Sequence, residues 1–372
     1  MRVFMYTGDY QKRGILPVLG GSVVLRKNDV STFSLEVNGG DLLSSRFEKG
    51  WRVVIEDEGR QLLCGAPDNI QRSSASGAQT LTMSGSSDAA WLRDMITLPD
   101  PSKAADQQDQ EAYYKRNGSA ANLVYDLVRS HIGQDARTEF KRVLIVDSPD
   151  AGLGKTVSIN SRFKTVLEEV QTLANNANVV VSLFQDDIAK TTRMSIKQTR
   201  DLSRVIRMTE INGGLGNWDM SEQAPTVTDV LVAGQGEGEN RTLKMVSGNA
   251  NEWGFKALQF QDRRDTDAVD ELIQAGEETL ADGAAKAAIN VAIEETDTKR
   301  FARDFGLGDK ITVQLMSGVI ISDIVQSAEI DWGENGRTVD LKIGPVADEQ
   351  DAPRWVPLVK SLQAQIRALQ AR

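Results

Sequence analysis

The chain has 372 residues, of which 40% are hydrophobic and 26% charged, so it is long enough for two to three globular domains with apolar cores. The formal net charge of −10 argues against a protein that grips nucleic acid, because phosphate binding needs clustered Lys and Arg. One cysteine, Cys64, excludes an internal disulfide and a cysteine-rich zinc site, and no stretch has the apolar length of a membrane span or the pattern of a signal peptide.

Residues 1–98 are predicted to form a first small β-barrel domain. Short apolar strands are separated here by clusters of Gly, Asn, Asp and Ser, which is typical of a small barrel or sandwich. The predicted strands are Val23–Leu25, Phe33–Val37, Trp51–Ile55 and Leu81–Met83. Cys64 lies in a strand-like run, and we expect it to be a small buried side chain.

Residues 99–203 are predicted to form a small α+β domain, which begins where Leu98-Pro99-Asp100-Pro101 interrupts the β pattern. Ser119 is the expected cap of a helix that ends near Gly133, and Ser161 is the expected cap of a second helix. The predicted strands of this domain are Arg142–Val146, Val179–Val181 and Met194–Ile196.

Residues 204–252 and 297–346 are predicted to form a second β-barrel domain, with Val227–Val232 as its clearest strand. A helical insertion, residues 253–296, interrupts it with an Ala-rich helix over Thr266–Ala288. Residues 347–372 are predicted to be an acidic linker and a C-terminal amphipathic helix. The predicted fold class is therefore mainly β, with two related barrels, an α+β domain, a helical insertion and a terminal helix.

Two segments about 260 residues apart share a glycine, an apolar strand, a tight turn with a second glycine, and a return strand. The first begins Gly50-Trp51-Arg52-Val53 and turns at Glu58-Gly59, and the second begins Gly308-Asp309-Lys310-Ile311 and turns at Ser317-Gly318. Any two β-hairpins share some of this pattern. The wide spacing nevertheless favours two related β-domains over a short-period solenoid.

Pro149-Asp150-Ala151-Gly152-Leu153-Gly154-Lys155-Thr156 resembles a phosphate-binding loop in which proline replaces the first glycine. Such a loop must lead directly into a helix, whose N-terminal amides complete the phosphate cradle. Here Thr156–Asn160 has the pattern of a strand. We therefore predict a glycine-rich turn between two strands and no nucleotide site.

Other catalytic patterns are weak. His131 is the single histidine and has no Gly-x-Ser-x-Gly partner, so we expect it to lie near a helix C-terminus, where a cationic side chain interacts favourably with the helix dipole. The pairs Asp186-Asp187 and Glu168-Glu169 could serve glycoside hydrolysis but are more typical of solvated surface. We predict no enzyme activity and no catalytic, cofactor-binding or metal-binding residue.

The C-terminal segment carries an apolar stripe with heptad spacing. Its members are Trp355, Val359, Leu362, Ile366 and Leu369. Two heptads are too short to hold a coiled coil alone. The stripe is therefore either a contact between subunits or a face that packs on its own subunit.

The order of these elements resembles the tail-tip or baseplate hub family of long-tailed phages, in particular the siphophages of actinobacteria, and is similar to the hubs of contractile tails. The resemblance covers nearly the whole chain. Its recognisable parts are Gly50-Trp51-Arg52-Val53, Met83-Ser84-Gly85 to Trp91-Leu92-Arg93 with Leu98-Pro99-Asp100-Pro101, and Phe305 to Val313.

The resemblance implies a structural protein of the virion tail tip, made in the host cytoplasm. Three subunits with two barrels each would form a pseudo-sixfold ring that joins a sixfold tail tube to a threefold tip and surrounds the DNA channel. The implied partners are the chain itself as a homotrimer, a distal tail or tail-tube protein, a tape measure protein, and tip, fibre or receptor-binding proteins. DNA would meet the ring only in transit, and no cofactor or membrane contact is implied.

Three alternatives stay open from sequence alone. One is the hub of a contractile injection system. Another is an enzyme, either a tail-associated cell-wall hydrolase or a P-loop NTPase. The last is a multi-domain binding protein that forms no ring.

Overall fold

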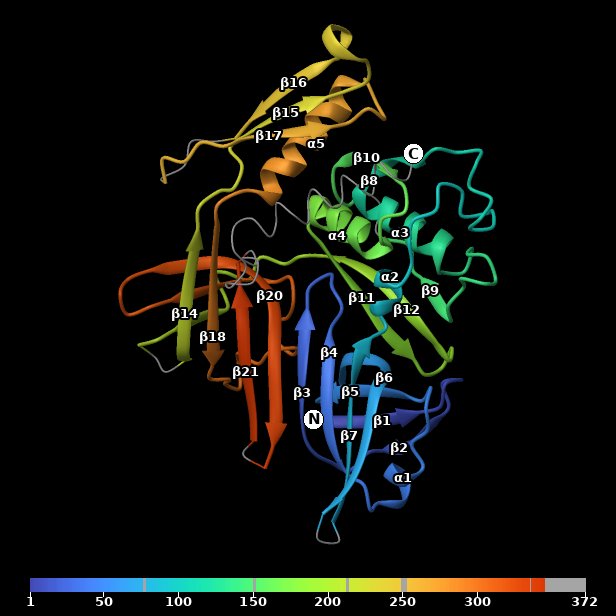
Figure 1. Cartoon of the computed structure of the whole chain (residues 1–372). Helices are drawn as coiled ribbons and strands as arrows, with labels where there is room; N and C mark the ends of the chain where they lie inside the picture. The colour runs from blue at the N-terminus through green and yellow to red at the C-terminus, as the bar shows by residue number, and fades with distance from the viewer. Residues whose placement is uncertain (76–77, 150–151, 212–213, 249–252, 335, 345–372) are drawn as a thin grey trace. The chain divides into compact units, whose positions relative to one another are not determined.

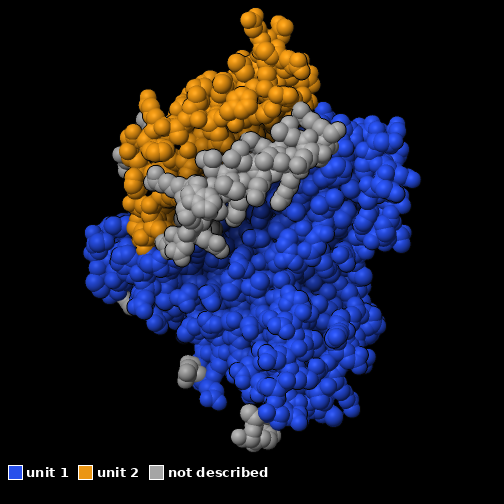
Figure 2. Space-filling view, viewed as in Figure 1, with its two compact units in different colours: residues 1–219, 290–343 blue, residues 220–289, 344–372 orange. Residues whose placement is uncertain are grey.

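The computed structural model describes the chain up to residue 344 except residues 76–77, 150–151, 212–213, 249–252 and 335. The chain divides into two compact units, coloured in Figure 2: Met1–Asp219 with Asn290–Ile343, and Met220–Ile289 with Gly344–Arg372. Residues 220–289 of the second unit are thus inserted in the sequence of the first. None of the helices in the described residues has the length and apolar character needed to cross a bilayer.

Unit 1 is built on a 13-stranded, almost entirely antiparallel sheet (Figure 1). Its main path runs β14-β18-β21-β20-β3-β4-β7-β6-β5-β1-β2, and β19 joins β13 to β20. The first strands are β1 Arg2–Tyr6, β2 Lys12–Ile15, β3 Val18–Arg26, β4 Thr32–Asn38, β5 Arg52–Asp57, β6 Arg60–Ala75 and β7 Ala78–Ser87. The others are β13 Arg207–Thr209, β14 Leu215–Gln223, β18 Lys286–Ile293, β19 Lys310–Gln314, β20 Ile320–Gly333 and β21 Gly336–Ile343. Residues 220–223 of β14 and 286–289 of β18 are assigned to unit 2, so the chain passes from one unit to the other within these two strands.

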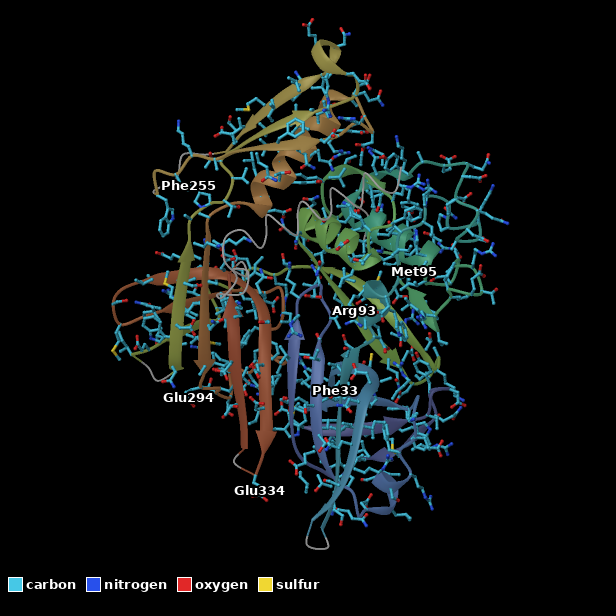
Figure 3. The ribbon with its side chains drawn as sticks, viewed as in Figure 1. Phe33, Arg93, Met95, Phe255, Glu294 and Glu334 are labelled. Carbon is cyan, nitrogen blue, oxygen red and sulfur yellow. The ribbon has the colours of Figure 1, made fainter. Side chains whose placement is uncertain are left out.

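Strand β4 illustrates how the sequence pattern selects the buried face of this sheet. Phe33 (labelled in Figure 3), Leu35 and Val37 are buried, whereas the residues between them are exposed. Successive side chains of a strand point to opposite faces, so the alternation commits one face to the core. The four strands predicted in residues 1–98 are all present.

An α+β region of unit 1 follows the first seven strands. Helices α3 and α4 pack on each other and on short sheets in one apolar core that includes Leu127, Val170 and Met194. The helices of this region are α2 Ala90–Arg93, α3 Ala120–His131 and α4 Val166–Ala177, whereas the short helix α1 Leu42–Ser45 lies between β4 and β5 in the chain. The strands are β8 Tyr114–Ser119, β9 Leu144–Val146, β10 Thr156–Ser161, β11 Val179–Asp186 and β12 Thr191–Gln198.

The predicted caps of these helices require correction. Helix α4 begins after Thr165, which forms a capping box with Glu168, whereas Ser161 is the last residue of β10. The box satisfies two backbone N–H groups, which Ser161 cannot do from a strand that is paired with β8. Ser119 does precede α3, but its side chain makes no capping hydrogen bond.

Unit 2 contains a three-stranded sheet of β15 Asp229–Ala233, β16 Leu243–Ser247 and β17 Leu258–Asp262, with η1 Gly238–Asn240 and α5 Val269–Asp282. The strand predicted at Val227–Val232 is therefore present as β15, but it does not belong to the sheet that contains β19 to β21. The predicted helix is shorter than Thr266–Ala288. Gly283 follows α5, and the apolar residues from Lys286 onward form β18 instead.

Candidate functional site

Both predicted hairpins are present, and their glycines have matching conformations. Gly50 and Gly308 both have φ of +81°, and Gly59 and Gly318 have φ of +78° and +85°. Positive φ is accessible to glycine at little cost, so these residues set the entry and the turn of each hairpin. The hairpins are β5–β6 and β19–β20.

The repeat extends through the next strand of each copy, and the separation in sequence between equivalent residues stays constant along it. Pro67 and Val325 are 258 positions apart, and so are their partners Gly85 and Ile343. The same separation holds for every later pair as far as Ala75↔Ala78 and Gly333↔Gly336, and both ladders shift at the same place, after Pro67 and after Val325. A bulge is a specific device of strand pairing, so its recurrence indicates a duplicated structure.

The neighbouring strands repeat as well. We call β3, β4, β5, β6 and β7 the first module and β14, β18, β19, β20 and β21 the second module. In hydrogen-bonding order they run β3-β4-β7-β6-β5 and β14-β18-β21-β20-β19, which is the same order in each. Sequence reasoning found the two hairpins and the flanking strands β3, β4 and β7 of the first module, but it did not find that these flanking strands recur as β14, β18 and β21. Gly50 and Gly308 are 258 positions apart, as are Pro67 and Val325. This constant separation is the signal that could have extended the sequence match from the hairpins to the flanking strands.

The two modules are joined by the pairing of β3 with β20, visible in Figure 1 as neighbouring strands. At this joint Val23 pairs with Ile330, and both side chains are fully buried. The joint is formed by β3 and by residues 327–332 of β20. The counterpart of β3 in the second module is β14, and the counterpart of residues 327–332 in the first module is Asn69–Ser74 of β6. In the described part of the chain β14 pairs only with β18, and Asn69–Ser74 pairs only with β7.

Arg52 of the first hairpin connects β5 to the α+β region through a buried polar network. Its guanidinium forms an ion pair with Asp88, and Thr192 Oγ1 donates to the same carboxylate at 2.6 Å. The guanidinium also lies 4.4 Å from the centre of the Tyr10 ring. Cys64 Sγ lies 3.4 Å from Asp88, and burial raises the pKa of this thiol. Cys64 is therefore the small buried side chain predicted from sequence.

A second ionic cluster connects the first turn to the second module. The buried Asp57 carboxylate accepts hydrogen bonds of 3.2 and 3.1 Å from Arg300 Nη2 and lies 3.6 Å from Arg337 Nη2. Arg337 also pairs with Glu295. Because Asp57 ends β5 and Arg337 lies on β21, this cluster fixes one module against the other.

The phosphate-loop resemblance is structural, as predicted. Thr156 begins strand β10, so no helix follows the loop. The loop instead presents carbonyl oxygens to α3: Ala120 N donates to Lys155 O at 3.0 Å, and Ala121 N donates to Leu153 O at 3.4 Å. These contacts cap the helix in place of the Ser119 side chain. A phosphate cradle is completed by the N–H groups of a helix that follows the loop, and here the strand β10 follows instead.

His131 is a neutral core residue, which corrects the expectation of a cation at a helix end. Its Nε2 accepts a 3.0 Å hydrogen bond from Leu98 N, and its Nδ1 lies 2.8 Å from Leu127 O, so Nδ1 carries the proton. Burial lowers the pKa of His131, because the imidazolium would lose its hydration.

The carboxylate pairs have structural partners. Asp186 accepts hydrogen bonds from Ile188 N and Ala189 N in the β11–β12 turn, and Asp187 accepts from Tyr6 at 2.7 Å. Glu168 belongs to the capping box of α4, and Glu169 pairs with Lys164 at 3.2 Å. Among the described residues, no group of His, Cys, Asp or Glu is arranged to hold a metal ion.

Comparison with protein families gives a match over most of the chain. Residues 1–345 match the family of siphovirus ReqiPepy6 Gp37-like proteins. The chain belongs to this family. The resemblance to siphophage proteins drawn from the sequence is thereby confirmed. A search of curated proteins found no significant match.

Solved structures show which fold this siphovirus family member has. A tail protein from Neisseria meningitidis MC58 is similar at 12% identity with a TM-score of 0.60, covering 92% of this chain and 96% of that one. The 43 kDa tail protein of prophage MuSo2 from Shewanella oneidensis gives the same identity and TM-score, covering 92% and 98%. The prophage tail protein gp18 from Listeria monocytogenes EGD-e is similar at 9% identity with a TM-score of 0.52 over the whole of both chains. The siphovirus family member thus has the mainly β fold of these phage tail proteins. This agrees with the prediction from sequence that the chain is a tail protein of the virion.

Proposed function

We propose that the protein is a structural hub of the phage tail tip, in which three copies form a ring with six similar modules. The single observation that carries this proposal is the repeated register of the two modules. Two like modules per chain let a threefold assembly present six similar surfaces, so it can join a sixfold tail tube to a threefold tip. The two modules would be the two small β-barrel domains predicted from sequence.

The charge balance suits a conduit for DNA. A net charge of −10 repels phosphate, so DNA would pass through a ring of these subunits without being gripped. The partners that we propose are a distal tail or tail-tube protein and a tape measure protein on one side, and tip, fibre or receptor-binding proteins on the other.

A non-enzymatic role is supported by the described side chains with catalytic potential. His131 is buried and neutral, the loop at Gly152–Thr156 caps a helix, and the acidic pairs stabilise turns and a helix start. Zymography on peptidoglycan tests the remaining hydrolase alternative. We expect no clearing, and clearing that disappears in an Asp186→Asn/Asp187→Asn variant would overturn the structural role.

The apolar stripe Trp355, Val359, Leu362, Ile366 and Leu369 lies outside the described residues, and we propose it as a contact between subunits. The competing arrangement is packing within the chain. Unit 2 offers a surface for that, because Leu243, Met245, Leu258 and Phe260 on its sheet are about half exposed. Deletion of residues 353–372 separates the two: loss of the oligomer with unchanged melting supports the contact between subunits, and lower melting with an unchanged oligomer supports packing on unit 2.

Imaging of the virion tests the hub proposal most directly. A reconstruction of tails that carry this protein with an antibody fragment bound should show three copies in a closed ring below the tube. One copy, or a location in the capsid or along the tube, would overturn the proposal. A sheath around the same tube would instead identify the hub of a contractile system.

A further inference from the structure

The open edges of the two modules, β14 and Asn69–Ser74 of β6, are exposed to any chain that can pair with them. Neither segment contains a proline or a lysine, two of the residues with which proteins block an edge. An unblocked strand edge is a template for another strand. In the part of the chain that the structure describes, both edges are therefore free to accept a further strand.

Residues of the second module that lie beside β3 are more buried than their counterparts in the first module, which have no strand beside them. Ala328 and Ile330 of β20 are fully buried where β3 lies beside them. Their counterparts 258 positions earlier are Ile70, which is half-buried, and Arg72, which is exposed. The first module thus lacks the strand that the second module receives from within the chain.

The charges of the two edges distinguish the possible pairings. β14 carries Asp219 and Glu222, whereas Asn69–Ser74 carries Arg72 as its only charged residue. Pairing β14 with β14 would bring acids together, and pairing β6 with β6 would bring two arginines together. Pairing β14 with β6 places opposite charges on adjacent strands.

We infer that β14 of one copy pairs antiparallel with Asn69–Ser74 of β6 in a second copy of this chain, and so repeats between chains the β3–β20 joint found within each chain. The contact is heterologous, since each copy offers two different edges, and it closes into a ring when its rotation divides a full turn. This inference rests on the hub proposal for the number of copies in the ring.

Cysteine cross-linking in assembled tails tests the contact. Asp331 lies opposite Ser22 at the joint within the chain, and Ser73 is the counterpart of Asp331. The test variants therefore combine Ser73→Cys with Asn217→Cys or with Asp219→Cys, two neighbouring positions on the same face of β14. The control Ser22→Cys/Asp331→Cys should form a bond within one chain, and Ser73→Cys/Ser102→Cys should form none. The native Cys64 is buried and stays in place.

At least one test variant should give covalent ladders that stop at three chains. Absence of linked chains for both test variants, in tails where the control bond forms, would overturn the inference. Ladders longer than three chains would support the strand contact but contradict the threefold hub.

Wild-type protein supplies a second readout that no substitution can disturb. Amide hydrogen exchange over residues 69–74 and 215–219 should be at least about tenfold slower in assembled tails than in the isolated chain. Equal exchange in both states would overturn the inference even if a variant failed to assemble.

Discussion

At the scale of single residues, Arg52 shows how one side chain of the recognised Gly-Trp-Arg-Val segment connects two parts of unit 1. Arg52 and Asp88 are 6% and 3% exposed, so each depends on the other for its charge balance. We expect Arg52→Met to lower the free energy of unfolding by about 3–5 kcal/mol, because the Asp88 carboxylate is left buried without its cation. Urea unfolding measures this loss. The matched control is Arg93→Met, since Arg93 forms an exposed pair with Asp94 and should lose at most about 1 kcal/mol. Equal losses in the two variants would refute the role of the network.

His131 gives a prediction on pH dependence at the same scale. Its pKa in the folded chain is below the ordinary value of 6.5, because burial disfavours the imidazolium. The unfolded chain therefore binds the proton more readily, and the stability from neutral His131 is complete above pH 6.5 and declines as the pH falls toward the folded pKa. We expect the melting temperature to fall from pH 7 to pH 5.5 more steeply in the wild type than in His131→Gln, whose amide can replace both hydrogen bonds. An equal fall of the melting temperature with pH in both proteins would contradict a neutral, buried His131.

At the scale of elements, the loop before β10 shows what its glycines do in this structure, where a strand and not a helix follows the phosphate-loop pattern. Gly152 and Gly154 both have φ of +83°, but only Gly154 packs closely: a Cβ there would lie 2.7 Å from Ala177 Cβ, whereas a Cβ at Gly152 meets nothing within 4 Å. Gly152→Ala should therefore cost about 1–2 kcal/mol of backbone strain alone. Gly154→Ala should cost more, because α4 must also move. Thermal and urea unfolding of the pair compare them directly, and equal costs would show that the loop does not pack on α4.

At the scale of the whole molecule, the sheet of the isolated chain has two unpaired edges in its described part, β14 and Asn69–Ser74 of β6. Addition of a strand satisfies backbone groups along both edges at once, so a closed ring is favoured over a partial one. We expect mass photometry of concentrated protein to show single chains and complexes of three, with few complexes of two. Tail partners would shift this equilibrium toward the ring by mass action. A continuous series of larger masses would indicate filaments and would contradict ring closure.

The sequence by itself determined the features that depend on local chemistry. The glycines at positions 50, 59, 308 and 318 and the alternation in Phe33–Val37 predicted turns and strands, because backbone conformation and apolar period act over a few residues. The strand pattern from Thr156 onward likewise predicted β10 in place of the helix that a phosphate loop requires. Only the tertiary structure decided which partners those elements take. The bulges after Pro67 and Val325, the joint between Val23 and Ile330, and the separate sheet of β15 depend on strands far apart in the chain, and strand pairing is set by packing across that distance rather than by any local pattern.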